Sequence, residues 1–182
     1  ASVFLPFLPL LPAQILLNNL LYDVSEIPIP LDRADAAETA RPQKWDMRLI
    51  RNFMWVLGPV SSLFDFLTFY VLLAVLHANE TLFRTGWFVE SLATQVLVIF
   101  VIRTRASPLA SRPHPALAAV CLAIVALAVA LPFTPLAATL GFAPPPPVFF
   151  GVLAALVAAY LALAEVAKRA FYRHSRRERV AA

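Results

Sequence analysis

Hydrophobic positions along the chain fall into long blocks that shorter polar stretches separate. A helix that crosses a hydrocarbon core of about 30 Å needs roughly 20 mostly apolar residues. Five blocks reach or approach this length, and we predict membrane-spanning helices at about residues 3–24, 52–76, 87–102, 116–133 and 148–166. The stretches between them carry the charged residues and prolines that end helices. The pattern therefore predicts an all-α fold, a polytopic membrane helix bundle of five transmembrane helices.

Composition agrees with a membrane protein and excludes several other classes. Hydrophobic residues make up 60% of the chain and charged residues only 14%, and the mean hydropathy is +0.75. The single cysteine, Cys121, lies in an apolar block, so we expect it to fill space in the core, and an internal disulfide is excluded. The sequence contains no Gly-rich phosphate loop, dinucleotide fingerprint, zinc-ligand spacing or Ser-His-Asp arrangement. Soluble-enzyme chemistry is therefore not expected.

Basic residues are concentrated on one set of loops. The net charge is +4, and the Lys and Arg residues gather in segments 25–51, 103–115 and 167–182, with only Arg84 in a loop of the other set. Cytoplasmic loops collect Lys and Arg, which places the C-terminus in the cytoplasm and the N-terminus outside. The basic residues therefore mark sidedness, and we expect no nucleic-acid partner. The tail either binds anionic lipid or is simply the cytoplasmic flank of the last helix.

The first of the five predicted spans begins on the outer side of the membrane. This is an ordinary topology if a further helix precedes Ala1. We therefore expect the chain to be part of a longer protein.

The stretch "LPAQILLNNLLYD", residues 11–23, places polar side chains inside the first predicted span. Asn19 and Asp23 are four residues apart, so on a continuous helix they share a face. Amide and carboxylate oxygens are ligands that hard cations such as Mg²⁺ and Ca²⁺ prefer, and we predict this pair as a metal site. Asn18 and Tyr22 form a second pair, rotated by about 100°. They are candidates for an ion path, although Asn18 alone is equally suited to bonding a neighbouring helix.

Three further polar residues of the predicted spans, Asp65, Glu90 and Gln95, are candidates. A charged residue at mid-bilayer costs on the order of 2–3 kcal/mol or more, which marks it as a functional candidate. Asp65 has hydroxyl residues such as Ser61 and Thr68 about one turn away, and it is either an ion ligand or a structural anchor. Glu90 and Gln95 lie on an ion path or at the membrane interface. All three are retained as candidates for an ion path or a structural polar role.

The residues quoted above resemble a known family. "LPAQILLNNLLYD" resembles the sixth membrane helix of P-type cation pumps, in which a Pro-x-Gln segment leads to an Asn and, four residues later, to an Asp that both coordinate the transported ion. Pro12, Gln14, Asn19 and Asp23 match this pattern. Together with "RPQKWD", "GPVSSLFDFLTF" and "GWFVESLATQ", the stretch is similar to bacterial magnesium-transporting P-type ATPases. The resemblance implies that residues 1–182 are the sixth to tenth membrane helices, the C-terminal membrane domain.

This resemblance carries expectations about ions, partners and location. It implies that Asn19 and Asp23 are the ion ligands, that Mg²⁺ is the transported ion, and that ATP acts only through domains absent from this chain. The phosphorylated-aspartate motif and the nucleotide-binding segments of the family are missing from these residues, so no catalytic residue is predicted here. The implied partners are the lipid bilayer and the remaining helices and cytoplasmic domains of the pump. The implied location is the bacterial inner membrane.

Two alternatives stay open. One is a P-type pump for calcium or another cation, although Val98 stands where calcium pumps carry an acidic ligand in the eighth helix. The other is a non-enzymatic membrane subunit or a decayed pump remnant, which would bind partners through its helices.

Overall fold

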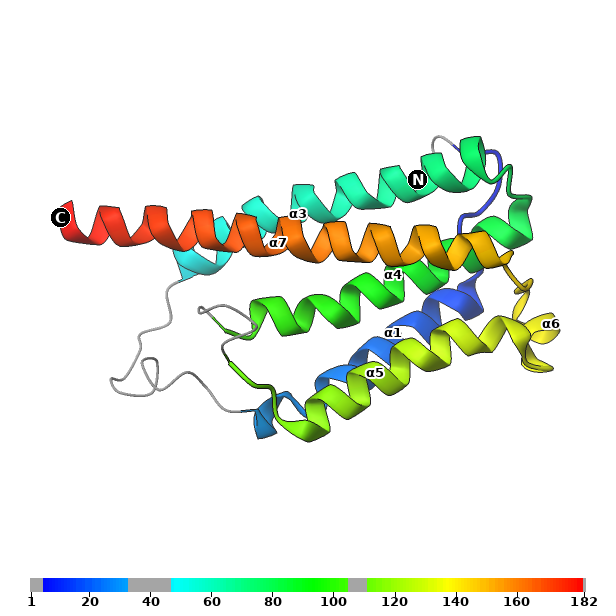
Figure 1. Ribbon diagram of the computed structural model, residues 1–182, viewed down its shortest axis with the longest axis horizontal. Helices are drawn as coiled ribbons and strands as arrows, with labels where there is room; N and C mark the ends of the chain where they lie inside the picture. The colour runs from blue at the N-terminus through cyan, green and yellow to red at the C-terminus, as the bar shows by residue number, and fades with distance from the viewer. Residues whose placement is uncertain (1–4, 33–46, 105–110, 182) are drawn as a thin grey trace.

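The computed structural model describes residues 5–32, 47–104 and 111–181, with side chains except at 48, 49 and 174–181. The regular elements of these ranges are helices (Figure 1). They are α1 (Pro12–Glu26), η1 (Ile29–Leu31), α3 (Met47–Tyr70), the π-helical η2 (Val71–Val75), α4 (Glu80–Ile102), α5 (Pro115–Ala130), η3 (Leu131–Phe133), α6 (Leu136–Leu140) and α7 (Pro147–Ala181). The long helices lie side by side along the long axis of the molecule (Figure 1). The predicted all-α class is confirmed.

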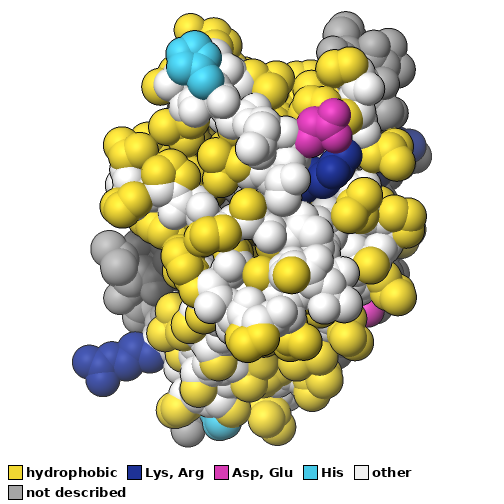
Figure 2. Space-filling model, turned by 90° about the vertical axis from the view of Figure 1, so that its right-hand side faces the viewer, with side chains coloured by type: hydrophobic (Ala, Val, Ile, Leu, Met, Phe, Trp, Pro, Cys, Tyr) yellow, Lys and Arg dark blue, Asp and Glu magenta, His cyan; other side chains and the backbone are white. Residues whose placement is uncertain are grey.

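Four helical segments are long and apolar enough to cross a membrane: Ile50–Val75, Glu80–Ile102, Pro115–Phe133 and Pro147–Arg173. The chain is therefore a multi-pass membrane helix bundle. Large hydrophobic side chains such as Leu63, Phe66 and Val166 are exposed on the long helices, and hydrophobic side chains also lie among other groups on the end face shown in Figure 2. Since lipid tails are apolar, hydrophobic residues outside the core are the expected surface of such a bundle.

The first predicted span differs from the structure. We expected a helix over residues 3–24, but α1 is a 15-residue helix that begins at Pro12 and follows a non-helical segment, residues 5–11. Pro6 and Pro9 lie in that segment, and proline lacks the N–H that a helix interior requires. Pro12 is accommodated because it stands at the start of the helix, where the N–H has no intrahelical partner. At 1.5 Å per residue, α1 alone is about 22 Å long, shorter than a full crossing.

Helix α4 is the centre of the bundle. It packs against α1, α3, α5 and α7, and its side chains Phe83, Phe88, Leu92 and Val96 are fully buried. The helix begins seven residues before the predicted span at 87–102. It does so because the side chain of Asn79 accepts a hydrogen bond from the backbone N of Leu82 at 2.9 Å, which caps the first turn.

Two polar clusters tie helix ends together near the C-terminal end of the bundle. Asp32 accepts hydrogen bonds from Arg103 Nη1 at 2.8 Å and from the backbone N of His114 at 2.7 Å. This contact joins the segment after α1 to the end of α4 and the start of α5. Lys168 on α7 is fully buried and donates to two carbonyl oxygens at the end of α4. Both clusters satisfy backbone groups that helix termini leave without intrahelical partners.

The lone cysteine and the basic loops complete the comparison with the sequence. Cys121 is fully buried in the hydrophobic core, as expected. Several basic residues that carry the sidedness prediction lie outside the described residues, namely Arg33, Arg41, Lys44 and Arg105. The predicted sidedness therefore stays a prediction.

Candidate functional site

Helix α1 has two polar faces that point in different directions. One face is turned into the bundle and buries Gln14, Asn18 and Ser25. Asn19 and Asp23 lie on the other, exposed face, among apolar side chains such as Leu16 and Leu20, with exposed fractions of 70% and 56%. The helix is continuous through residues 12–26, so the pair shares a face as the spacing predicts. This face points away from the other helices of the chain.

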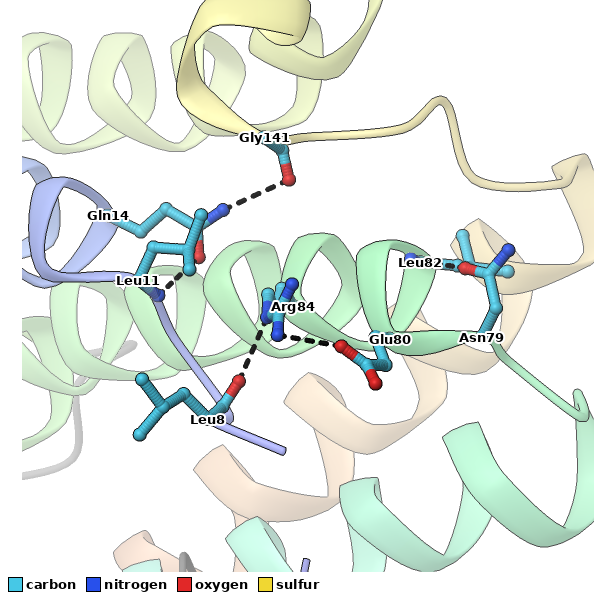
Figure 3. A network of polar contacts seen from close by, with 8 residues as sticks. All are labelled: Leu8, Leu11, Gln14, Asn79, Glu80, Leu82, Arg84 and Gly141. Atoms are coloured by element: carbon cyan, nitrogen blue, oxygen red, sulfur yellow. Dashed lines mark hydrogen bonds and ion pairs between the residues drawn. The ribbon is translucent and has the colours of Figure 1, made fainter. Parts of the chain in front are cut away.

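Gln14 fixes the start of α1 (Figure 3). Its Oε1 accepts a hydrogen bond from the backbone N of Leu11 at 2.9 Å, and its Nε2 donates to the carbonyl oxygens of Leu140 at 2.9 Å and Gly141 at 3.2 Å. Gly141 ends α6 in the left-handed region with φ 71°, which favours glycine. Gln14 therefore joins the first turn of α1 to the end of α6, which sequence reasoning did not reveal. The available signal was an amide three residues after the N-cap position.

Arg84 on α4 holds the segment that leads into α1. It donates a hydrogen bond through Nε to the carbonyl oxygen of Leu8 at 2.9 Å and forms an ion pair with Glu80 at 2.9 Å (Figure 3). Its guanidinium also lies 5.7 Å from the ring centre of Phe7, within the range of a cation–π contact. In the sequence Arg84 stood out only as the single basic residue of its loop set. The structure shows that it secures the proline-containing segment against α4.

Asn18 links α1 to α4 through a chain of amide and hydroxyl groups. Its Nδ2 donates to Gln95 Oε1 at 3.3 Å, and Gln95 Nε2 donates to Ser91 Oγ at 2.7 Å. The side chain of Asn18 is 7% exposed, and its Oδ1 is buried without a hydrogen-bond partner. Tyr22, the predicted companion of Asn18, is only partly buried. Asn18 therefore makes the kind of helix-to-helix contact that polar residues provide in membranes.

A cavity of about 80 Å³ lies between α3, α4 and α7, and we call it the polar cavity. Its lining combines two carboxylates, four hydroxyls, one amide and one ring: Asp65, Glu90, Ser61, Ser91, Thr94, Tyr160, Gln95 and Phe64. The structure thus brings Asp65, Glu90 and Gln95 together, and Asn18 reaches them through Gln95. Asn19 and Asp23 are not among the lining residues.

The contacts of the two carboxylates differ from those considered in the sequence. Asp65 Oδ1 accepts a hydrogen bond from the indole Nε1 of Trp87 at 3.3 Å, rather than from Ser61. Ser61 instead bonds the hydroxyl of Tyr160 at 3.0 Å. Glu90 is 1% exposed and lies ten residues after the start of α4, which is about 15 Å along the helix. Glu90 is therefore buried in the bundle and not placed at its end.

Sequence reasoning missed Tyr160 as a member of this cluster. It is a single hydroxyl within an Ala- and Leu-rich helix, and its partner Ser61 is 99 residues away in the chain. No spacing rule connects two such positions, because the contact depends on how α3 and α7 pack.

The Asn19–Asp23 pair and the polar cavity both offer oxygen atoms as ligands. Among the described residues there is no group of three or more His, Cys, Asp and Glu side chains that would hold a metal ion. The pair and the cavity each combine carboxylate oxygens with amide or hydroxyl oxygens. Such oxygens are the ligands of hard cations that retain several waters. Soft metals would require thiolate or imidazole groups.

Comparison with known proteins places the chain in a family. The sequence model of the family "Cation transporting ATPase, C-terminus" matches residues 7–170. A magnesium-transporting ATPase, P-type 1, of Salmonella typhimurium strain 14028s is 43% identical over 173 residues, which cover 92% of this chain and 19% of that protein. The Escherichia coli K12 protein of the same name is 43% identical over 176 residues, with the same coverage.

A further protein of this name, from Salmonella typhimurium strain LT2, is 39% identical over 177 residues. The chain spans 19% of the length of these relatives. The resemblance seen in "LPAQILLNNLLYD" and the later segments is thereby confirmed. Because the family match extends over residues 7–170, the chain belongs to the cation-transporting ATPase C-terminus family.

Proposed function

We propose that the chain is the ion-binding membrane part of an ATP-driven Mg²⁺ importer of the P-type, in which Asn19 and Asp23 coordinate the transported ion. The observation that carries this proposal is the placement of these two side chains on the exposed face of α1. The names of the relatives support Mg²⁺ as the ion. Phosphorylation elsewhere in the full-length pump opens and closes the site.

The exposed face of α1 needs a polar partner. A carboxylate exposed to lipid at mid-bilayer costs about 2–3 kcal/mol or more. Asp23 and Asn19 are turned away from the other helices of this chain, so a stable arrangement requires protein or an ion beside them. The remaining helices of the pump supply this partner and complete the ligand set, and its cytoplasmic domains supply ATP hydrolysis.

Two protein ligands suit Mg²⁺ because this ion loses its hydration water reluctantly and is commonly held by one or two carboxylates plus waters. Ca²⁺ takes six to eight oxygens at longer distances and requires a fuller set of protein ligands. The pair on α1 offers one carboxylate and one amide, which matches the small number of protein ligands that Mg²⁺ needs. The pair on α1 therefore suits Mg²⁺ better than Ca²⁺.

Helix α1 and the segment before it together form a further membrane crossing, in addition to the four long spans. The helix contributes about 22 Å, and the non-helical residues 5–11 extend its reach toward the thickness of the hydrocarbon core. The protein resides in the bacterial inner membrane, with the N-terminal end of this chain outside and its C-terminus in the cytoplasm. The basic segments support this orientation through the positive-inside rule.

The test uses the full-length pump that contains this chain, reconstituted in liposomes. Mg²⁺ uptake is measured against Mg²⁺ concentration for wild type, Asp23→Asn and Asn19→Ala. Each substitution is expected to raise the half-saturating Mg²⁺ concentration by about tenfold or more, which corresponds to about 1.4 kcal/mol. Leu20→Ala, on the same exposed face, is the matched control and is expected to leave it unchanged.

Unchanged uptake curves in both Asp23→Asn and Asn19→Ala would remove these residues from the ion site. A pump that transports Ca²⁺ in preference to Mg²⁺ would refute the proposed ion while retaining the site. A full-length protein that folds and hydrolyses no ATP would favour the non-enzymatic alternative.

A further inference from the structure

The polar cavity lies at the middle of the helices that form it. Asp65 is in the second half of the Ile50–Val75 span, Glu90 is near the centre of the Glu80–Ile102 span, and Tyr160 is near the centre of the Pro147–Arg173 span. These positions correspond to the depth at which polar groups are most costly in a bilayer. A cluster of hydroxyl, amide and carboxylate groups at this depth therefore needs an explanation.

Several oxygens in and beside the cavity lack a well-formed hydrogen bond. Glu90 Oε2, Thr68 Oγ1 and Asn18 Oδ1 are all buried without a hydrogen bond of normal geometry, although Thr68 lies close enough to Glu90 to interact with its carboxyl group. Their side chains are 1%, 1% and 7% exposed. Buried polar groups in native proteins are almost always satisfied by protein, water or an ion. The unsatisfied oxygens therefore indicate that the cavity holds an occupant.

The charges of the lining residues indicate which kind of occupant fits the polar cavity. The two acidic side chains of the cavity, Asp65 and Glu90, line one small space, and none of its lining residues is a Lys, Arg or His. The indole N–H of Trp87 reaches only Asp65. Two ionised carboxylates in a low-dielectric interior repel each other, and each is unfavourable there unless it is paired. A positively charged occupant allows both carboxylates to be ionised, whereas without one they are held as neutral acids.

We propose that the polar cavity binds a small hard cation, as a second site separate from the Asn19 and Asp23 pair. Asp65 and Glu90 provide the negative charge, and the hydroxyls of Ser61 and Tyr160 provide neutral oxygen ligands. The site is formed entirely by this chain, whereas the pair on α1 faces outward.

The size and connections of the cavity fit this occupant. One water needs about 10–15 Å³ of such space, so 80 Å³ accommodates a cation with part of its hydration shell. Gln95 lines the cavity and bonds Asn18, the immediate neighbour of Asn19 in α1. An ion in the cavity is therefore linked through Gln95 and Asn18 to α1, the helix that carries Asn19 and Asp23.

The test measures cation binding in the full-length protein in lipid nanodiscs, without nucleotide and in an Asp23→Asn background. Infrared difference spectra are recorded as Mg²⁺ is added, and again with Na⁺ and Ca²⁺, to follow the carboxylate stretching bands. A shift of these bands on cation addition is expected, and Glu90→Gln is expected to abolish the component that belongs to the cavity. Glu80→Gln, a solvent-facing acid on the same helix, is the matched control and should leave that component intact.

A milder variant keeps the test independent of folding. Tyr160→Phe removes one hydroxyl and retains the ring that packs against Phe64. It is expected to weaken the apparent cation affinity by several-fold while the protein stays folded. The ion that produces the shift at the lowest concentration identifies the cation.

Three outcomes would overturn the proposal. One is a spectrum in which Glu90→Gln removes the C=O band of a protonated acid and no cation changes that band, which would mean that the cavity holds neutral acids and water. Another is loss of the entire cation response in Asp23→Asn alone, which would leave only the α1 site. The third is unchanged affinity in both Glu90→Gln and Tyr160→Phe. The first and third results are independent of whether Asn19 and Asp23 coordinate the transported ion.

Discussion

Lys168 offers a stringent test of how the bundle holds its helix ends. Its Nζ donates to the carbonyl oxygens of Val101 at 2.9 Å and Thr104 at 3.1 Å, and it lies 2.6 Å from Glu165 Oε2 in an ion pair. The side chain is fully buried. Lys168→Met keeps an unbranched apolar stem of similar length and removes the ammonium group, so both carbonyls at the end of α4 lose their donor.

The expected cost follows from these contacts. Hydrogen bonds from a charged donor contribute about 1.5–3 kcal/mol each, and the desolvation of a buried ammonium offsets part of this sum. Glu165 retains Arg169 as a partner at 2.6 Å in the variant. We therefore expect Lys168→Met to destabilise the end of α4 by about 3 kcal/mol, within the range for breaking a buried ion pair.

Hydrogen exchange of the full-length protein in detergent measures this locally. Peptides that cover the end of α4 are expected to open about 100-fold more often in Lys168→Met, since each 1.4 kcal/mol is a factor of about ten. Arg169→Met is the matched control, because Arg169 binds the same Glu165 while its side chain is 53% exposed. An exposed ion pair contributes about 0–1 kcal/mol, so its effect should stay below about fivefold. Equal effects of the two variants, or less than a tenfold effect of Lys168→Met, would refute the reasoning.

Two further predictions concern packing and the start of α1. A Cβ at Gly86 would lie 2.6 Å from Leu72 Cδ2, so Gly86→Ala is expected to lower the unfolding free energy by about 1–3 kcal/mol. Gly151→Ala in α7 is its control, because a Cβ there would have open space around it, and it should stabilise α7 by about 0.5–1 kcal/mol. Denaturant unfolding in detergent compares the two variants, and equal signs of the two changes would contradict the packing argument. Gln14→Leu removes the donor to two carbonyl oxygens at the end of α6 and is expected to destabilise this contact by about 1–3 kcal/mol. Faster hydrogen exchange around Gly141 measures the loss, and unchanged exchange there would contradict the anchoring role of Gln14.

Local pattern was enough to predict several features of this chain. The hydrophobic blocks alone predicted an all-α membrane protein, because a stretch of about 20 apolar residues with few charges is typical of a transmembrane helix. The shared face of Asn19 and Asp23 follows from helix periodicity, which depends only on spacing. The prolines at 6 and 9 also carried the information that α1 begins late. The prediction of a helix from residue 3 gave them too little weight.

Other features depended on tertiary structure. The sequence contained Asp65, Glu90 and Gln95 as separate polar residues on two predicted helices, and only the packing of α3, α4 and α7 collects them with Tyr160 around one cavity. The roles of Gln14 and Lys168 likewise depend on carbonyl groups that come from distant helix ends.

The physical reason lies in the membrane as a solvent. In a soluble protein, hydrophobicity distinguishes the inward face of a helix from the outward face, but lipid accepts apolar side chains as readily as a protein core does. The sequence by itself therefore determined the four long apolar segments that can cross the membrane and which polar residues share a helix face. Only the tertiary structure decided that Asn18 turns toward α4 while Asn19 and Asp23 turn away from the bundle.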